Sequence, residues 1–222
     1  MDARTARLER RRDQAREEIL AATREVLLEG GVGALTLAAV ARRVGLTKAA
    51  LYYYFPSKEA LAFELMVRYH VAEVEVIEAA VARAKGGTEA VEALVRSVAD
   101  YYAERMDEFR LSYMQRQMQR RSDAGIDSQI VERIRPLNDR LYRRTAELVL
   151  QDQERGRANA AVDGRRLAFV AHMSVIGVLA MEAYIDSIGD APLVHSHAAM
   201  VEELVQSFRA RLAPGPAAGA KR

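Results

Sequence analysis

Apolar residues recur every three or four positions along nearly the whole chain, which is the spacing of an amphipathic helix. No segment sustains the alternation of apolar and polar residues that a half-buried strand requires. The pattern therefore predicts an all-α fold of about nine helices. Half of the residues are hydrophobic, so a chain of this length can bury a substantial core.

Glycine, proline and capping side chains divide the N-terminal part into four expected helices. The first should run from about residue 13 to the glycine pair at 30–31. Threonines can cap a short helix at 36–44 and another at 47–55, which the proline at position 56 terminates. A serine can then cap a longer helix that continues toward residue 84.

The remainder of the chain is predicted to be helical, with glycines in the connecting loops. The expected helices cover residues 88–108, 109–121, 127–155, 163–187 and 192–212. We expect a DNA-binding domain at 1–62, a larger helical domain at 63–212 and a disordered tail at 213–222, which lacks residues to bury.

The two short helices have the proportions of a helix-turn-helix, a motif in which the second helix enters the major groove of DNA. A glycine lies in the tight turn between them, and a long supporting helix precedes them. The sequence Phe55-Pro56-Ser57-Lys58 opens the next helix directly afterwards. This order of parts strengthens the assignment beyond what helix length alone provides.

The segment ILAATREVLLEGGVGALTLAAVARRVGLTKAALYYYFPSKEAL, residues 19–61, resembles the N-terminal signature of the tetracycline-repressor (TetR) family. The resemblance implies a three-helix DNA-binding domain followed by a helical domain for ligand binding and dimerisation. It also implies a homodimer that binds double-stranded DNA at a palindromic operator and responds to a small-molecule effector. Repression is the family's usual output, and the residues leave activation open.

The start of the third helix would point at base edges if the resemblance holds. Thr47, Lys48 and Ala49 occupy this end. Lys48 can donate to guanine acceptors or to a phosphate, and Ala49 permits close approach or contact with a thymine methyl group. We expect these three residues to contact DNA.

Further DNA contacts are expected from side chains around the third helix. Tyr53 and Tyr54 lie where the family places groups that face bases and backbone, and packing is the alternative for both. Lys58, in the first turn of the next helix, can hold a phosphate, and Thr36 can cap its own helix or hold a phosphate. Three neighbouring residues are expected to pack inside: Leu51, Tyr52 and Phe55.

Arginines crowd the N-terminus although the formal net charge of the chain is only +2. They are Arg4, Arg7, Arg10, Arg11, Arg12 and Arg16. This cluster is either a solvated, frayed tail or an arm that touches phosphates, and the sequence leaves both open. No apolar core follows the arginines, so we expect neither a secretion signal nor a membrane anchor here.

The chain contains no cysteine, which excludes disulfides, thiolate catalysis and cysteine-ligated zinc. His195 and His197 are two residues apart and would diverge on a helix, so we expect no metal site and no cofactor. The uncharged stretch 167–181 is shorter than the roughly 20 residues that a bilayer requires, which favours a buried helix and no membrane partner. We expect a cytoplasmic protein.

The C-terminal domain would hold its effector between helices lined by amphipathic or adaptable side chains. The candidates are Tyr101, Tyr102, Tyr113, Met114, Met118, Tyr142, His172 and Met173. For each of them, ordinary core packing is the alternative. His172 in particular can be a core histidine with satisfied hydrogen bonds, a ligand contact or a pH-sensitive group.

Helices 163–187 and 192–212 carry wide apolar faces, and the family resemblance implies that they form a four-helix dimer interface. The faces consist of Leu167, Val170, Ala171, Ser174, Gly177, Val178 and Met181, and of Val194, Val201, Leu204, Val205, Phe208 and Leu212. Intramolecular core is the alternative, and some of these residues must serve it.

Two other functions compete with a regulator. One is a helical small-molecule enzyme in which Glu182, His172 or the tyrosines act as acid-base groups, but no nucleophile motif or phosphate-binding loop supports it. The other is a protein-interaction module whose DNA binding is vestigial. We expect no catalytic residues.

Overall fold

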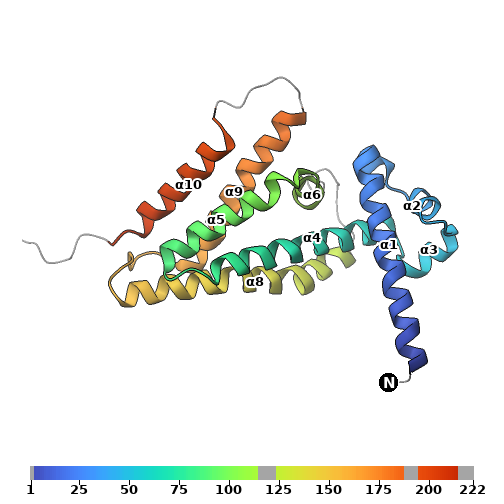
Figure 1. Cartoon of the computed structure of the whole chain (residues 1–222), viewed down its shortest axis with the longest axis horizontal. Helices are drawn as coiled ribbons and strands as arrows, with labels where there is room; N and C mark the ends of the chain where they lie inside the picture. The colour runs from blue at the N-terminus through green and yellow to red at the C-terminus, as the bar shows by residue number, and fades with distance from the viewer. Residues whose placement is uncertain (1–2, 115–123, 188–194, 215–222) are drawn as a thin grey trace, which may run out of the picture. The chain divides into compact units, whose positions relative to one another are not determined.

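The computed structural model describes residues 3–114, 124–187 and 195–214 (Figure 1). In these ranges the chain forms helices and no strand, which confirms the all-α prediction. Four earlier expectations fall wholly or partly outside the described residues: Met118, the part of the expected helix 109–121 beyond residue 114, the tail beyond residue 214 and the start of the last helix. The side chain of Met114 is not described either.

The chain divides into two compact units. Unit 1 contains residues 1–69 and 121–127, and unit 2 contains residues 70–120 and 128–222. The division falls between Tyr69 and His70, inside helix α4, Lys58–Val81.

Helix α1, Ala3–Ala34, begins well before the position expected from the sequence. The start near Asp13 was wrong because alanine, arginine, glutamate and leucine all favour the helix, and no glycine or proline interrupts them after residue 3. At the predicted stop the helix is interrupted rather than ended: Gly31 has φ +66° and ψ −168°, which produces a kink, and helical residues continue to Ala34.

Two short helices follow with the predicted caps. Helix α2 spans Leu37–Arg43 and helix α3 spans Lys48–Tyr54. Gly45, with φ +67°, closes α2: its N–H donates to the Arg42 carbonyl at 3.4 Å, and the Leu46 N–H donates to the Ala41 carbonyl at 2.9 Å. This pair of bonds is a Schellman motif, and it turns the chain sharply from α2 into α3.

The core of unit 1 holds both short helices through side chains with almost no exposed surface. Ile19 comes from α1, Val40 from α2, Leu51 from α3 and Leu61 from α4, and all four are completely buried. Because α3 buries Leu51 and the following Phe55, its opposite side is left outside the core. The core therefore determines which side of α3 is available to a partner.

Unit 2 contains the rest of α4 and most of α8, Ala124–Glu154, whose first residues up to Asp127 belong to unit 1. Its other helices are α5, Gly87–Ala103, α6, Met106–Phe109, α9, Gly164–Ser187, and α10, His197–Leu212. A π-helical turn, η1, Arg110–Met114, continues α6. Several boundaries differ from the prediction: α4 ends at Val81 rather than near residue 84, and α8 begins at Ala124 rather than at residue 127. The expected helix 88–108 stops at Ala103, residues 110–114 form a π-turn, and residues 195–196 precede α10 because Ser196 is its N-cap.

The core of unit 2 is apolar and lies between its helices. α5 packs against α9 and α10, which also pack against each other, and Arg140 of α8 pairs with Glu78 of α4 at 2.5 Å (Figure 1). Asp152 of α8 accepts a hydrogen bond from the Gly87 N–H at 2.7 Å, which satisfies a free donor at the start of α5. These contacts hold the helices that form the polar cluster described below.

Candidate functional site

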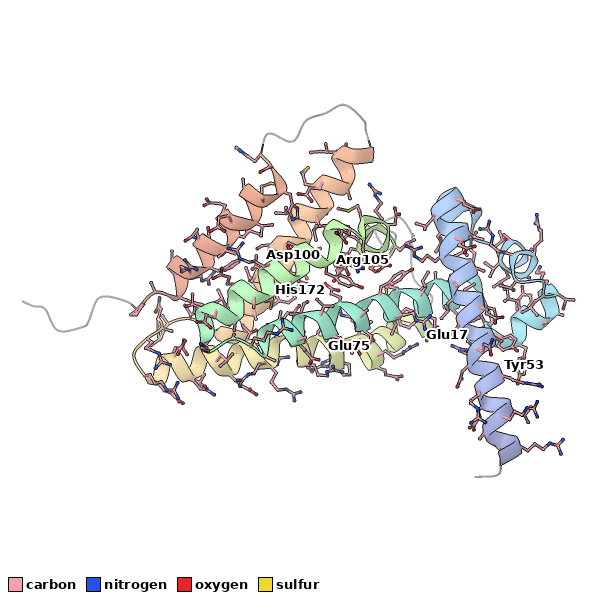
Figure 2. The ribbon with its side chains drawn as sticks, in the orientation of Figure 1. Glu17, Tyr53, Glu75, Asp100, Arg105 and His172 are labelled. Carbon is pink, nitrogen blue, oxygen red and sulfur yellow. The ribbon has the colours of Figure 1, made fainter. Side chains whose placement is uncertain are left out.

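The outward side of α3 carries the residues predicted to face DNA. Lys48 and Ala49 are exposed in its first turn, and the Tyr53 side chain is 72% exposed (Figure 2). Leu51 and Phe55 are buried, as predicted. The helix is therefore anchored on one side and free on the other, which is the geometry that groove binding requires.

Tyr52 departs from the expectation that it packs inside. Its side chain is 47% exposed, and the Lys48 ammonium group lies 5.8 Å from the centre of its ring, within cation–π range. Leu51 and Phe55 are one helical turn apart and share the inward face, so the position next to Leu51 is turned away from that face. Tyr52 therefore belongs to the exposed surface together with Lys48.

Tyr54 is half-buried at the end of α3, and Arg16 holds the backbone there. The Arg16 guanidinium donates to the Tyr54 carbonyl at 3.2 Å and lies 4.5 Å from the centre of the Phe55 ring. The Tyr54 ring also packs edge-to-face against Tyr53, with ring centres 5.2 Å apart. Sequence reasoning placed Arg16 with the other N-terminal arginines, whereas the structure gives it a positioning role.

The hydroxyl groups at three helix starts both cap and remain available as donors. Thr36 accepts from the Ala39 N–H at 3.0 Å, Thr47 from the Ala50 N–H at 3.1 Å and Ser57 from the Ala60 N–H at 3.0 Å. A hydroxyl that accepts one hydrogen bond can still donate its own proton to a phosphate. Capping at Thr36 is thus compatible with phosphate binding.

Lys58 is exposed in the first turn of α4. No carboxylate pairs with it anywhere in the described part of the chain. Its charge adds to the partial positive charge of the free N–H groups at the helix start, and both favour an anion.

Unit 2 contains a buried polar cluster centred on the Glu73 carboxylate of α4. Glu73 is completely buried, and three side chains donate to it: His172 Nε2 at 2.9 Å, His70 Nδ1 at 3.0 Å and the Tyr113 hydroxyl at 2.7 Å. An ionised carboxylate accepts hydrogen bonds with both oxygens, so these donors satisfy it.

The cluster extends to α8 through both histidines. The Tyr142 hydroxyl lies 2.8 Å from His172 Nδ1, and because His172 Nε2 faces Glu73 as a donor, the hydroxyl can donate to Nδ1. His70 Nε2 lies 2.9 Å from the Asn138 side-chain oxygen. Both nitrogens of His70 thus face oxygen acceptors, an arrangement that favours the protonated ring.

The pKa values in this cluster follow from burial and from these hydrogen bonds. Burial alone would raise the pKa of Glu73, but hydrogen bonds from His172 and His70 outweigh it and lower the pKa from 4.5 to about 2. Burial alone would lower the pKa of His70, but Glu73 raises it above 6.5. Burial, and then the Glu73 charge, raise the pKa of Tyr113 and Tyr142, so these phenols stay protonated.

Several buried hydroxyl groups in unit 2 make no hydrogen bond within the described part of the chain. They belong to Tyr102, Ser112 and Thr145. Tyr102 also lies in an aromatic group, with its ring centre 5.3 Å from that of Phe109 and 6.0 Å from that of Tyr113. Ser112 and Tyr113 lie in the π-turn η1, a rare conformation that is frequent at functional sites.

The structure brings four of the predicted ligand residues together: Tyr102, Tyr113, Tyr142 and His172. Tyr101 is half-buried beside them, and burial, followed by Glu108, raises its pKa to about 12. Met173 is 37% exposed on α9 and does not join the buried group.

Sequence reasoning missed the charged members of the cluster and the residue that bonds to one of them. Glu73, His70 and Asn138 were not predicted. The available signal was Glu73 itself, because it lies one helical turn before Ile77 on the buried face of α4, where a charged side chain is unusual.

The long helix α9 exposes an apolar strip on the side away from its own core. The strip consists of Phe169, Val170, Met173, Gly177, Met181 and Tyr184. By length and composition, residues 164–185 are the one segment in the described ranges that could cross a membrane, and 33% of the most apolar window is buried. Leu167 and Ala171, expected on the same face as Val170, belong to the core instead.

The apolar side of α10 is used within the unit. Val201, Val205, Phe208 and Leu212 are buried against the core of unit 2, so they follow the intramolecular alternative. His197 of α10 pairs with Glu182 of α9 at 2.8 Å. Among residues 3–114, 124–187 and 195–214, no group of three or more His, Asp or Glu side chains is arranged to hold a metal ion.

A family model described as bacterial regulatory proteins, tetR family, matches residues 19–65. These residues run from the second half of α1 through α2 and α3 into α4. No curated protein sequence matches the chain significantly.

Solved structures share the fold over most of the chain. A protein of unknown function from Rhodococcus sp. RHA1 is 24% identical, with a TM-score of 0.67 over 89% of this chain and 95% of that one. A TetR/AcrR-family transcriptional regulator from Thermobifida fusca YX-ER1 is 21% identical, with a TM-score of 0.64 over 94% and 100%. The regulator FadR from Bacillus subtilis, in complex with stearoyl-CoA, is 14% identical, with a TM-score of 0.68 over 88% and 98%.

Proposed function

We propose that this chain functions as a dimeric transcriptional regulator that a small molecule releases from a palindromic operator. The match of residues 19–65 to the model of bacterial regulatory proteins, tetR family, supports this proposal. The protein would act in the cytoplasm by binding rather than by catalysis, and as a repressor. Three parts of this proposal rest on separate observations: DNA binding on α3, dimerisation on α9, and effector binding at the Glu73 cluster.

The observation that carries the proposal is the exposed side of α3 on a rigid support. Leu51 and Phe55 fix the helix, Gly45 sets the turn before it, and Lys48 and Tyr53 face outward. Lys48 can donate to guanine O6 and N7 in the major groove. Lys58, together with the hydroxyls of Thr36 and Thr47, can hold the flanking phosphates.

Fluorescence anisotropy with the DNA upstream of the protein's own gene tests this part. Lys48→Ala should reduce the preference for the specific fragment over random DNA. Lys58→Ala should lower the affinity for all DNA sequences alike. It should also reduce the slope of log affinity against log salt by about 1, because one phosphate contact is lost. Equal loss of specificity from both substitutions would contradict these assignments.

Dimerisation is supported by the apolar strip on α9. Exposed apolar side chains at helical spacing need a cover, and a second copy related by a two-fold axis can supply the same strip. Gly177 lies in the strip with nothing within 4 Å of the position of an added Cβ, so a second helix can approach closely there. The buried apolar side of α10 leaves α9 as the main contributor.

Sedimentation of the purified protein tests the dimer. Gly177→Arg should produce a monomer that no longer binds the palindromic fragment tightly, because two half-sites are no longer held together. Leu150→Arg is the matched control, because Leu150 is 55% exposed on α8, outside the strip. A monomeric wild-type protein, or a Gly177→Arg dimer, would exclude this interface.

Effector binding is supported by the polar cluster in unit 2. Burying an ionised carboxylate with two histidines is costly, and an apolar core of the same volume is often as stable or more so. Such clusters gather at functional sites. The unbonded hydroxyls of Tyr102, Ser112 and Thr145 add polar groups that a bound molecule can satisfy. The surrounding aromatic rings favour a partly apolar effector.

The effector signal can reach DNA through a shared helix. α4 carries Lys58 in its first turn and Glu73 further along the same helix. A molecule that displaces Glu73 or its partners would thus act on the helix that also carries the proposed phosphate contact of Lys58. A preference of about 1 to 3 kcal/mol for the conformation that does not fit DNA would be typical of such coupling.

The site can be tested by measuring which small molecules release DNA from the protein. The panel should contain apolar molecules with anionic, neutral and cationic head groups, and it should include stearoyl-CoA. For a molecule that releases DNA, Tyr142→Phe should weaken its effect about tenfold, the loss of one hydrogen bond. Affinity for DNA without effector should stay unchanged. If a molecule releases DNA equally well from the wild type, from Tyr142→Phe and from Tyr102→Phe, it binds elsewhere. That result would contradict the assignment of the effector site.

A further inference from the structure

The first part of α1 stands apart from the core of its own unit. Between Arg4 and Glu18 no side chain is buried, and Ile19 is the first residue of α1 in the core. Figure 1 shows this dark blue segment with no other helix of unit 1 beside it. We call residues 3–15 the N-terminal arm. The helix-turn-helix (HTH) surface, by which we mean the proposed DNA contacts Thr36, Thr47, Lys48, Tyr53 and Lys58, does not include it.

The charge of the N-terminal arm is strongly positive and largely uncompensated. It contains five arginines against the carboxylates of Glu9 and Asp13: Arg4, Arg7, Arg10, Arg11 and Arg12. All five are exposed, and Arg7, Arg10, Arg11 and Arg12 form no ion pair within the described ranges. Arg4, Arg7 and Arg11 follow the spacing that puts side chains on one face of a helix.

An isolated helix of this length and charge is poorly stabilised by itself. Helices without tertiary contacts are marginal in water, and like charges one turn apart destabilise them further. A polyanion along the arginine face would replace repulsion with attraction. Guanidinium groups match phosphate oxygens in geometry, which makes phosphate the fitting ligand.

The root of the N-terminal arm is fixed next to α3 within the same unit. Arg16 donates to the Tyr54 carbonyl at the end of α3 and pairs with Glu64 of α4 at 3.9 Å. Glu17 pairs with Arg68 of α4. The N-terminal arm therefore extends from the core of unit 1 beside the helix that we propose enters DNA, and these contacts fix the direction in which it starts.

We propose that the N-terminal arm is a second DNA-binding element, an arginine helix that holds backbone phosphates beyond those contacted by the HTH surface. The contact is independent of sequence and rests on the proposed DNA-binding function. A membrane fits less well, because Leu8 is the one large apolar side chain in the arm and an interfacial helix needs a broad apolar face. Duplex DNA is the polyanion that we have already proposed as the partner of the same unit.

The test is the triple variant Arg7→Gln, Arg10→Gln and Arg11→Gln, measured by anisotropy on the specific fragment and on random duplex over a range of salt concentrations. The slope of log affinity against log salt should fall by about 2 to 3 per protomer, because each lost phosphate contact contributes about 0.9. The affinity for the specific fragment and the affinity for random duplex should decrease by the same factor. The thermal midpoint should stay unchanged because these side chains contact no core.

A charge-matched control separates arm contacts from net charge. Arg83→Gln, Arg155→Gln and Arg166→Gln remove the same charge from exposed positions of unit 2 and should leave the salt slope unaltered. Hydrogen exchange supplies a second measurement. Amides of residues 3–15 should become protected when wild type binds duplex, and the triple variant should lose that protection.

The outcomes distinguish the N-terminal arm from the proposed function. If the triple variant keeps the wild-type slope while Lys48→Ala still loses specificity, the arm proposal is overturned and the regulator stands. If wild type binds no duplex at low salt, both are overturned. If the variant alters binding only to vesicles that contain phosphatidylserine, the arm is a membrane element and the proposal is overturned.

Discussion

Nε2 of His172 on α9 lies 2.9 Å from Oε1 of Glu73 on α4, and both side chains are almost completely buried. This contact joins residues far apart in the sequence and places a negative charge inside unit 2. The charge is held by hydrogen bonds rather than by solvent, so the stability of unit 2 should depend on it.

Glu73→Gln should destabilise unit 2 strongly. The substitution removes the charge that His70 and His172 are oriented to meet, and breaking a buried pair of this kind costs roughly 3 kcal/mol or more. Urea unfolding followed by circular dichroism measures the change. Glu75→Gln is the control, because Glu75 is exposed on the same helix and should alter the free energy by less than about 0.5 kcal/mol. Equal effects from the two variants would show that the cluster adds nothing.

The stability of unit 2 should peak at mildly acidic pH. The pKa of Glu73 is lowered, so its contribution is present above about 4.5 and is lost as the pH falls toward 2. The pKa of His70 is raised, so its contribution is present below about 6.5 and is lost as the pH rises through the folded-state value. Urea unfolding midpoints measured between about pH 3 and pH 9 should therefore be highest at mildly acidic pH and should decrease toward both ends of this range. Glu73→Gln should flatten both limbs, and a wild-type profile that rises steadily to pH 9 would rule out the His70 contribution.

Gly45→Ala should destabilise unit 1 through its backbone alone. Gly45 has φ +67°, and nothing lies within 4 Å of an added Cβ, so the cost is the left-handed conformation itself, about 1 to 2 kcal/mol. Gly33→Ala is the matched control, with equal space around the added atom and no positive φ. The free energy of unfolding of the two variants measures the difference. An unchanged value for Gly45→Ala would mean that the turn between α2 and α3 is not held as described.

Arg16→Ala should weaken DNA binding without removing a base contact. The side chain supports the end of α3 through the Tyr54 carbonyl and the Phe55 ring, so its loss loosens the helix that carries Lys48 and Tyr53. We expect about a tenfold loss of affinity for the specific fragment, as for one charged hydrogen bond. Arg16→Lys, which retains the charge and loses the planar fork, should recover part of it at most. If Arg16→Lys restores the wild-type DNA affinity in full, Arg16 contributes only its charge, and the positioning role is wrong.

The sequence predicted the features that depend on local chemistry. Thr36, Thr47 and Ser57 cap their helices as expected, because capping involves residues only three positions apart. The start of α1 was missed because the arginine-rich segment was read as a tail, although its residues individually favour a helix.

The polar cluster could be predicted only in part because it depends on tertiary contacts. Tyr113, Tyr142 and His172 were identified by residue type, but Glu73 meets His172 across 99 positions of sequence. No periodicity encodes such a pairing. The inward placement of α10 was likewise ambiguous, since an apolar helix face has the same sequence pattern whether it packs on its own chain or on a partner.

Protection of guanine N7 atoms from methylation by dimethyl sulfate tests the central claim most directly, because N7 lies in the major groove where α3 is proposed to bind. On the upstream fragment, the wild-type dimer should protect guanines in two groups separated by a whole number of helical turns, each about 10 to 10.5 base pairs, and Lys48→Ala should lose protection at one guanine in each group. Bound DNA with every guanine N7 still reactive, or no binding to any promoter fragment in low salt, would contradict the account.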